Sequence, residues 1–410
     1  MGITPIFRAL MRHKLWPVLV ALQIALTLAA VCNSASIILQ RVQQMNRPSG
    51  IEESSLFTFQ NSWLSPGTDL KARISADLDL IRSIQGVQDA YATNNIPLLA
   101  AGRDYGAGSE TGIGAAPGLS VTATDRFYAD DHAIKTLGVR LVAGRWFTAD
   151  EILDIGPFDA KYPAVVVVTR ELARALFPQS DPLGQMIYFR NSTAPSRIIG
   201  IVERAQNSRA ATFANRSLSE HSAFMPYHFV YNGQFYVVRG KPGELAATMR
   251  AVQDRLFKGT PDRVIQNLKP FSQSRRESYA AMRASLVPLV EVGILLLTVT
   301  ICGVIGLTSY SVNQRRRYIG MRRALGASRL DILWYFHMEN LLIAGAGCIL
   351  GVLISLAGNT WLALNAQVSR MELPFIVAGG VVLLLICQGA ALWPALRAAR
   401  ISPASAIRAV

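Results

Sequence analysis

The histidines are the first residues of this chain whose type could do chemistry, either as metal ligands or as acids and bases. Five are present, at His13, His132, His221, His228 and His337. Their separations match no recognised metal-ligand spacing. His221 and His228 could meet on one loop, but a pair of loop histidines is more often solvated than bound to a metal. The sequence therefore predicts no metal site.

Acidic pairs and phosphate-binding motifs give no stronger indication of catalysis. The pairs Asp130–Asp131 and Glu52–Glu53 are typical of an ordinary protein surface. The motif G-x-x-x-x-G-K-[ST], which cradles nucleotide phosphates, does not occur in the 410 residues. We therefore expect this chain to be no enzyme and to bind no cofactor itself.

The cysteines lie in long apolar stretches, one in each. They are Cys32, Cys302, Cys348 and Cys387. None falls in the long segment between the first two stretches, so no disulfide framework stabilises that segment. Buried cysteine behaves as a small apolar residue, and we expect that role for all four.

The four apolar stretches cover residues 16–39, 286–312, 339–364 and 374–396. A helix needs about 20 apolar residues to cross a hydrocarbon core of about 30 Å, and each stretch is long enough. Only 17% of the chain is charged, against roughly a quarter in soluble proteins. The sequence therefore predicts a membrane protein with four transmembrane helices.

The charge distribution predicts the orientation of these helices. The net charge is +14, and the short segments 1–15, 313–338 and 397–410 together hold twelve basic residues and one acid, Asp331. Short basic segments stay on the cytoplasmic side, whereas long segments cross largely regardless of charge. We expect both termini and the 313–338 loop in the cytoplasm and residues 40–285 outside. The basic balance thus indicates topology, not nucleic acid.

The first apolar stretch has an alternative interpretation. Residues 11–32 have the basic start and apolar middle of a secretory signal peptide. The apolar run continues to Leu39, which is longer than a usual signal core, and Val31 is a poor residue before a lipoprotein cysteine. We therefore favour an uncleaved span.

The long segment 40–285 shows an α+β pattern at both of its ends. Apolar residues at helical spacing follow a short strand in 70–81 and again in 245–256, and a second strand follows each helix. These units predict a two-part α+β subdomain, at about 50–100 and 231–270. Residues 101–230 between them, rich in Gly, Pro and short β-like runs, predict an inserted and mostly β subdomain. The whole is a large α+β domain between the first and second transmembrane helices.

The most specific stretch is "RRRYIGMRRALGASRLDIL", which begins at Arg315. Gly320 and Gly326 can end or re-aim helical segments, and Ser328 is a good N-cap for the helix that follows. That helix begins with Leu330 and continues with further apolar residues at 332, 333, 335 and 336. One interpretation is a docking surface for a partner; the other is a basic topological anchor, which would not need this tail.

This stretch resembles the cytoplasmic loop of the FtsX-like, MacB-type permeases of ABC transporters. The resemblance extends to "TDRFYADDHAIKTLGVRLVAGRWFTADE" and "VVVTRELARALFPQSDPLGQMIYF" in the long segment and to "WPALRAARISPASAIRA" at the end. It departs at Tyr318, where the family usually has Glu. The resemblance implies a coupling helix that docks on a separate ATPase. The coupling residues it implies are Gly320, Arg322, Arg323, Ala324, Leu325, Gly326, Ala327, Ser328, Asp331, Ile332 and Leu333.

The resemblance also implies a function and partners. ATP and magnesium would be used by the partner ATPase, whose work would move the outer domain (mechanotransmission). The chain would pair with an identical or a related permease in the inner membrane, among its lipids, and an adaptor and an outer-membrane channel are further partners. Export of peptides or small molecules such as antibiotics is the expected function. The alternatives are release of lipoproteins and FtsX-like signalling to a cell-wall hydrolase.

Two features of the predicted transmembrane helices each have two possible interpretations. Gly347 and Gly351 permit close helix approach, at a dimer seam or by chance. Glu291 lies near the outer edge of the second span, where an acid is either functional or reaches the interface.

Overall fold

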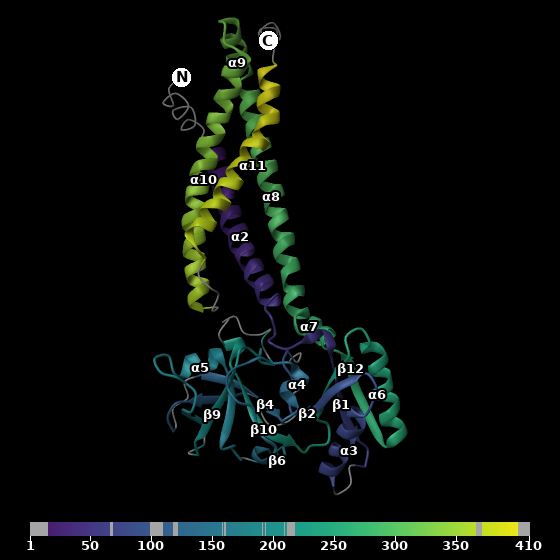
Figure 1. Cartoon of the computed structure of the whole chain (residues 1–410). Helices are drawn as coiled ribbons and strands as arrows, with labels where there is room; N and C mark the ends of the chain where they lie inside the picture. The colour runs from purple at the N-terminus through teal and green to yellow at the C-terminus, as the bar shows by residue number, and fades with distance from the viewer. Residues whose placement is uncertain are drawn as a thin grey trace. The chain divides into compact units, whose positions relative to one another are not determined.

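The computed structural model describes most of the chain. The described residues are 15–65, 69–98, 110–117, 122–157, 159, 161–190, 192, 194–208, 210, 218–365 and 371–400. The chain divides into a helical unit, Met1–Gln43 with Arg283–Val410, and a globular unit, Gln44–Met282 (Figure 1). Of the predicted cytoplasmic ends, residues 1–14 and 401–410 lie outside the described residues.

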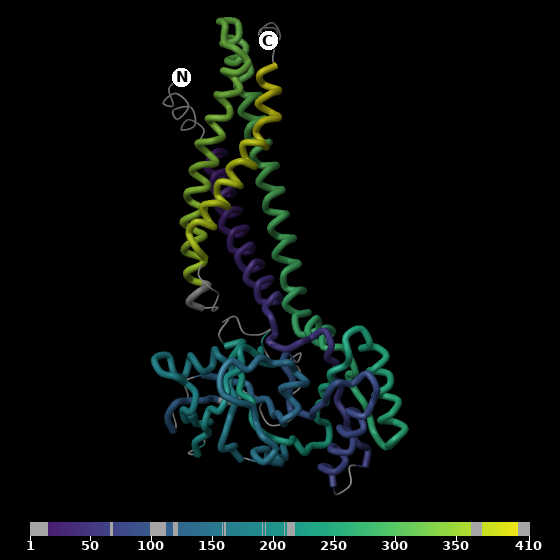
Figure 2. The backbone as a smooth tube through the Cα atoms, in the orientation of Figure 1, coloured from purple at the N-terminus to yellow at the C-terminus, as the bar shows by residue number. Residues whose placement is uncertain are grey.

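The helical unit contains long helices joined by short connections. The long helices are α2 (Leu15–Met45), α8 (Ala280–Gln314), α10 (Arg329–Asn365) and α11 (Leu373–Ala399), and the short α9 (Arg316–Ala324) connects α8 to α10. Among the described residues, four helices are long and apolar enough to cross a membrane. Helix α10 begins ten residues before the predicted span, because the apolar and helix-forming residues from Arg329 onward continue the helix without a break. Figure 2 shows α9 at one end of this unit.

Two glycines bring α10 close to α2. A Cβ at Gly347 would lie 2.7 Å from the carbonyl oxygen of Ala21, and one at Gly351 would lie 2.9 Å from that of Ala25. Side chains larger than hydrogen therefore do not fit at this contact. The glycine pair is used within the chain, between α10 and α2.

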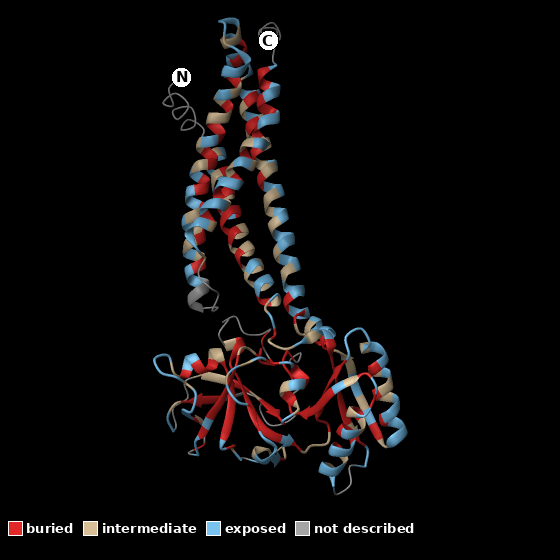
Figure 3. Cartoon of the chain, in the orientation of Figure 1, coloured by how far each residue is buried: buried red, intermediate tan, exposed pale blue. Residues whose placement is uncertain are grey.

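Polar side chains add further links in the helical unit. Thr27 of α2 and Thr300 of α8 share a hydrogen bond of 2.8 Å, and Asn33 of α2 donates to Ser355 of α10 at 3.2 Å. Three of the cysteines are buried among apolar side chains as expected, whereas Cys302 is exposed. Glu291 is exposed on α8, whose surface is mostly exposed or intermediate (Figure 3).

The first lobe of the globular unit is a four-stranded antiparallel sheet with helices α3 (Leu70–Arg82) and α6 (Leu245–Gly259). Its strand order is β12-β1-β11-β2, where the strands are β1 (Leu56–Trp63), β2 (Val87–Thr93), β11 (Phe235–Gly240) and β12 (Arg263–Pro270). The side chain of Asp69 caps α3 by accepting from the backbone N–H of Ala72 at 2.9 Å. Both ends of the unit's chain thus contribute to one sheet.

The second lobe is an eight-stranded sheet that closes on itself. Its strands are β3 (Glu110–Gly114), β4 (Thr122–Ala129), β5 (Leu141–Gly144), β6 (Leu153–Ile155), β7 (Val165–Thr169), β8 (Met186–Phe189), β9 (Ser196–Val202) and β10 (Ser222–Phe229). The order is β4-β3-β8-β9-β7-β10-β6, with β5 paired to β9 beside this path, and a parallel pairing of β4 with β10 joins the first strand to the sixth. Closure removes free sheet edges at these strands. The helix α5 (Arg170–Leu176) follows β7.

A shared core joins the two lobes. One cluster of buried side chains contains Tyr91 and Val237 from the first lobe together with Phe127 and Phe224 from the second. The rings of Trp146 and Phe224 lie 5.4 Å apart in it. Figure 3 shows the strands of this unit as largely buried. The lobes are therefore parts of one folded unit.

Arg275 joins the segments by which the chain enters and leaves the globular unit. It lies on α7 (Phe271–Ser278), the helix that follows β12. Its guanidinium donates to the carbonyl oxygens of Met45, at 2.8 Å, and Arg47, and it forms an ion pair with Glu53. The entering and leaving segments are thus held together by one side chain.

Candidate functional site

The connection from α9 to α10 is built by local capping interactions. Gly326 has a φ of +97°, which favours glycine, and it follows the last turn of α9. The N–H of Ala327 bonds to the carbonyl of Arg322 at 3.0 Å and the N–H of Gly326 bonds to that of Arg323 at 3.2 Å, which is a Schellman motif. The sequence prediction for Gly326 is confirmed. Gly320, in contrast, lies inside α9 and does not end a helix.

The next helix begins at the predicted cap. The hydroxyl of Ser328 accepts from the N–H of Asp331 at 3.2 Å, and the N–H of Ser328 bonds to the carboxylate of Asp331 at 2.9 Å. These two bonds satisfy donors that the start of a helix leaves unpaired. The capping residues fix a tight turn between α9 and α10.

Arginine side chains connect α9 and the residue before it to the other helices. Arg315 donates to the hydroxyl of Tyr335 at 2.7 Å and pairs with Glu339 at 3.0 Å, and both partners lie on α10. Arg323 donates to the carbonyl of Ala399 in α11 at 3.3 Å. A displacement of α9 would therefore strain its contacts with α10 and α11.

Arg322 adds an aromatic contact to this set. Its guanidinium lies 4.9 Å from the ring centre of Tyr318 and 5.8 Å from that of Tyr335. A cation over an aromatic face is attractive at such distances. Tyr318 therefore holds the arginine through its ring, at the position where an acid is usual in the family that this loop resembles.

The inner face of α9 is apolar and packed. Ile319 of α9 clusters with Ile332 and Phe336 of α10, and with Ala395 and Ala398 of α11. All five are buried. This cluster and the arginine contacts make α9 a fixed part of the helical unit.

The predicted coupling residues differ in their exposure. Gly320 and Ile332 are buried; Arg322, Arg323, Ala327 and Leu333 are half-buried; Ala324, Leu325, Gly326, Ser328 and Asp331 are exposed. The apolar residues from Leu330 to Phe336 therefore divide between two faces of α10. Ile332 packs inward and is not available to a partner in this structure.

Large apolar side chains are exposed at the end of α9 and the start of α10. Three of them, Met321, Leu330 and Trp334, were not among the predicted coupling residues, whereas Leu325 was. Met321, Leu325, Leu330 and Trp334 are 58%, 83%, 74% and 64% exposed, and we call these four residues the tip surface. Met321 and Leu325 are four residues apart, and so are Leu330 and Trp334, which is about one turn of helix. That spacing was the available signal in the sequence. An exposed apolar group of this kind indicates contact with another molecule.

The residues considered for metal chemistry lie apart from this site. His221 is buried beside β10 and shares a hydrogen bond of 2.8 Å with Thr122, and its burial lowers its pKa. His228 lies within β10 and not on a loop. His337 bonds to Gln388 at 3.0 Å in the helical unit, and His13 is outside the described residues. Among the described residues, no three His, Cys, Asp or Glu side chains could hold a metal ion together.

Comparison with protein families identifies both units. The model described as MacB-like periplasmic core domain matches residues 18–255. The model described as FtsX-like permease C-terminal matches residues 292–403. Together they cover most of the globular unit and most of the helical unit.

Individual relatives carry related descriptions. The macrolide export ATP-binding/permease protein MacB of Bordetella avium is 30% identical over 291 residues, which cover 66% of this chain and 41% of that protein. The protein of the same description from Agrobacterium fabrum is 27% identical over 232 residues, which cover 53% and 33%. The crystal structure of the periplasmic region of MacB from Actinobacillus actinomycetemcomitans aligns with 55% of this chain and 94% of its own, at 19% identity and a TM-score of 0.34.

The matches cover a small part of the relatives but a large part of this chain. This chain spans between a third and about two fifths of the length of the two MacB proteins. The periplasmic-core model, in contrast, matches more than half of the 410 residues, and the permease model accounts for α9, α10 and α11. The chain therefore belongs to the FtsX-like, MacB-type permeases of ABC transporters.

Proposed function

We propose that this chain is the membrane subunit of an ABC exporter and that it couples ATP hydrolysis on a separate polypeptide to movement of its globular unit. In this proposal the chain lies in the inner membrane with both termini and α9 in the cytoplasm and the globular unit outside. The cargo is a peptide or a small molecule such as an antibiotic. Relatives named as macrolide export proteins support that class of cargo.

One observation supports the coupling role above the others: α9 is fixed on its inner face, and large apolar side chains are exposed at the turn that joins it to α10. Its inner face is held by Arg315, Arg322 and Arg323 and by the cluster around Ile319. The tip surface is exposed and is shared by Met321 on α9, Leu325 just after it, and Leu330 and Trp334 on α10. A partner bound to the tip surface would therefore move α10 and α11 with it.

The proposal also assigns the partners with which this chain assembles. The 410 residues contain no phosphate-binding loop, so ATP and magnesium are bound by the partner. A second copy or a related permease completes the membrane part. An adaptor and an outer-membrane channel carry the cargo onward.

The test is a single substitution on the tip surface. Leu325→Asp places a charge in the proposed contact, where an unpaired charge costs several kcal/mol. We expect this variant to reach the membrane at the normal level but to lose co-purification with the ATPase and the hydrolysis that depends on both proteins. The matched control is Leu64→Asp, because Leu64 is also exposed, at 70%, but lies in the globular unit.

Two results would contradict the proposal. One is an unchanged yield of ATPase with Leu325→Asp. The other is robust ATP hydrolysis by the purified chain without a partner.

A further inference from the structure

A cavity of about 220 Å³ lies between the two lobes of the globular unit. Helix α3 lines it from the first lobe, and the residues after β4 and at the end of β10 line it from the second. A cavity of about 150 Å³ is enough to hold benzene in another protein. This cavity therefore has room for a ligand of about seven non-hydrogen atoms.

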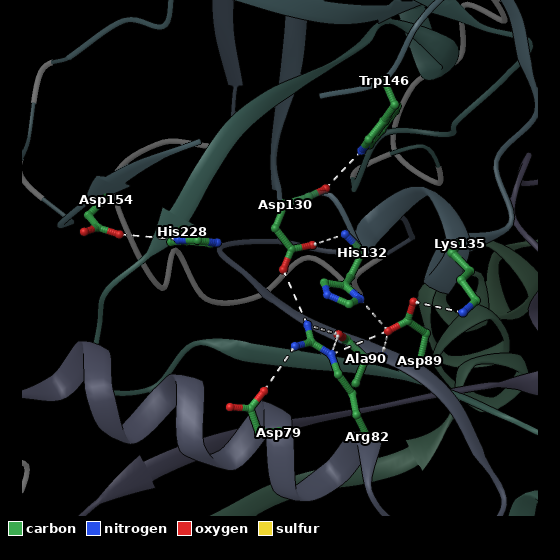
Figure 4. A network of polar contacts seen from close by, with 10 residues as sticks. All are labelled: Asp79, Arg82, Asp89, Ala90, Asp130, His132, Lys135, Trp146, Asp154 and His228. Carbon is green, nitrogen blue, oxygen red and sulfur yellow. Dashed lines mark hydrogen bonds and ion pairs between the residues drawn. The ribbon is translucent and has the colours of Figure 1, made fainter. Parts of the chain in front are cut away.

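The walls of the cavity are apolar on one side and polar on the other. Ile74 and Leu78 of α3 and Phe229 of β10 form the apolar side. Asp130 and the residues around it form the polar end, where side chains from both lobes gather around Arg82 (Figure 4). A ligand that fits both sides has an apolar body and one polar end.

The cations near the polar end already have partners at close range. Lys71 pairs with Asp154 at 2.6 Å. The guanidinium of Arg82 is held by two hydrogen bonds to the carbonyl oxygen of Ala90, at 3.0 and 2.7 Å, and lies 3.5 Å from the carboxylate of Asp89 and 3.7 Å from that of Asp79. Little of their charge is left to bind an anion, so the cavity does not select one.

The two histidines at the polar end are also engaged with carboxylates. His132 lies 2.8 Å from Asp89, and His228 lies 3.4 Å from Asp154. Each contact uses the Nδ1 atom of the ring. Both rings therefore already have a carboxylate partner.

The negative charge of the Asp130 carboxylate has few compensating partners. Its side chain is 5% exposed and accepts one backbone hydrogen bond, from the N–H of His132 at 3.0 Å. Among the described residues, Arg82 at 3.8 Å is the one cation within ion-pair distance of it. Burial raises the pKa of Asp130 to about 6. Asp131 beside it is exposed, and no described cation pairs with it.

The surplus of negative charge at Asp130 and Asp131 favours a cation as the ligand. The apolar side of the cavity favours a cation that carries an aliphatic chain. No three described His, Cys, Asp or Glu residues could hold a metal ion together, so the cation is organic. We propose that this cavity binds an alkylammonium group, with the ammonium beside Asp130 and the aliphatic chain against Ile74, Leu78 and Phe229. A free amine and a lysine side chain share this chemistry.

The proposal predicts how binding depends on pH. The charged and titratable groups that face Asp130 are Arg82 on α3, Tyr91 on β2, Asp131 and His132 next to it, and His228 on β10. Ionised Asp130 attracts the ammonium, so affinity falls as pH drops through 6. With about a tenth of Asp130 ionised at pH 5, we expect affinity to be roughly tenfold lower than at pH 7.5.

The experiment measures binding of defined probes to the full chain in zwitterionic nanodiscs, with empty nanodiscs as the blank and no ATPase present. Saturation-transfer NMR compares hexylamine with hexan-1-ol, which has the same length and no charge. We expect hexylamine to bind at least tenfold more tightly. N-acetyl-lysine amide, run in parallel, shows whether a lysine side chain is accepted as well as a free amine.

Two variants locate the site. Asp130→Asn keeps the size of the side chain and removes its charge, and it should lower hexylamine affinity at least tenfold. It should melt no lower than the parent, because Arg82 keeps its ion pairs with Asp79 and Asp89 and is not left uncompensated. Lost binding is then not lost folding. Asp254→Asn, on the exposed surface of α6, should leave affinity within twofold. Equal binding of hexylamine and hexan-1-ol, or full binding by Asp130→Asn, would overturn the proposal. Neither result depends on whether the tip surface binds an ATPase.

Discussion

Arg315 illustrates how one residue of a basic loop can have a structural role beyond topology. The positive-inside rule explains a cluster of arginines in this loop but not which of them contact other side chains. In the structure Arg315 pairs with Glu339, whose side chain is 8% exposed. Removing one partner of a buried pair leaves the other charge uncompensated, which is costly.

This pair gives a residue-scale prediction. We expect Glu339→Gln to lower the free energy of unfolding of the purified protein by about 3 kcal/mol, measured as thermal melting in nanodiscs. The double variant Arg315→Met with Glu339→Met should recover most of the loss, because neither charge remains. Glu372→Gln, at an exposed acid before α11, is the control and should melt like the parent. A double variant that is less stable than Glu339→Gln would contradict this account.

The roles of residues that act on their neighbours in the sequence were predictable, whereas contacts between residues far apart in the sequence were not. Gly326 and Ser328 act through the backbone of their neighbours, so their types alone indicate a helix end and a helix start. The partner of Glu339 lies 24 positions before it, across the turn from α9 to α10. No spacing rule predicts that contact. The four-residue spacing within the tip surface was visible in the sequence, but spacing alone does not tell whether such residues face the core or the solvent.

At the scale of elements, the glycines of α10 determine how closely it packs on α2. Lipid is as apolar as a leucine side chain, so helices in a membrane gain by close contact and not by the burial of apolar surface. Gly351 faces Ala25 and Leu28, whereas a side chain at Gly345 on the same helix would meet nothing within 4 Å. The two positions therefore offer a matched comparison.

We expect Gly351→Val to destabilise the purified protein by about 2 kcal/mol, as is usual for overpacking. Gly345→Val should have little effect on stability, because open space receives its side chain. Thermal melting of both variants in the same nanodiscs is the measurement. Equal melting temperatures would show that α10 does not pack on α2 through this glycine.

Elements were predictable where a pattern is local. The spacing of apolar residues in 70–81 and 245–256 predicts α3 and α6, and both helices are present. The closed sheet of the second lobe could not be predicted in this way. Its closure depends on the pairing of Phe127 with Phe224, which are far apart in the sequence and lie on short strands. Such a register is decided by packing in three dimensions.

At the scale of the whole molecule, the proposed orientation places α9 and the globular unit on opposite sides of the membrane. Ser83 is exposed in the globular unit, and Ala324 is exposed on α9. In a cysteine-free background, we expect Ser83→Cys to react with an impermeant thiol reagent in intact spheroplasts. Ala324→Cys should react only after permeabilisation. Labelling of Ala324→Cys from outside would reverse the orientation.

The contacts of Arg275 have a consequence for how force passes through the chain. β1 and β12 are antiparallel neighbours, and Phe57 at the start of β1 lies opposite Pro270 at the end of β12. Tension that separates these two ends would open the ladder one hydrogen bond at a time, the direction in which a sheet is mechanically weakest. Arg275 links the entering and leaving segments just before that ladder, through its contacts with Met45, Arg47 and Glu53. Tension on either leading segment would therefore be carried by both segments, and β1 and β12 would stay paired.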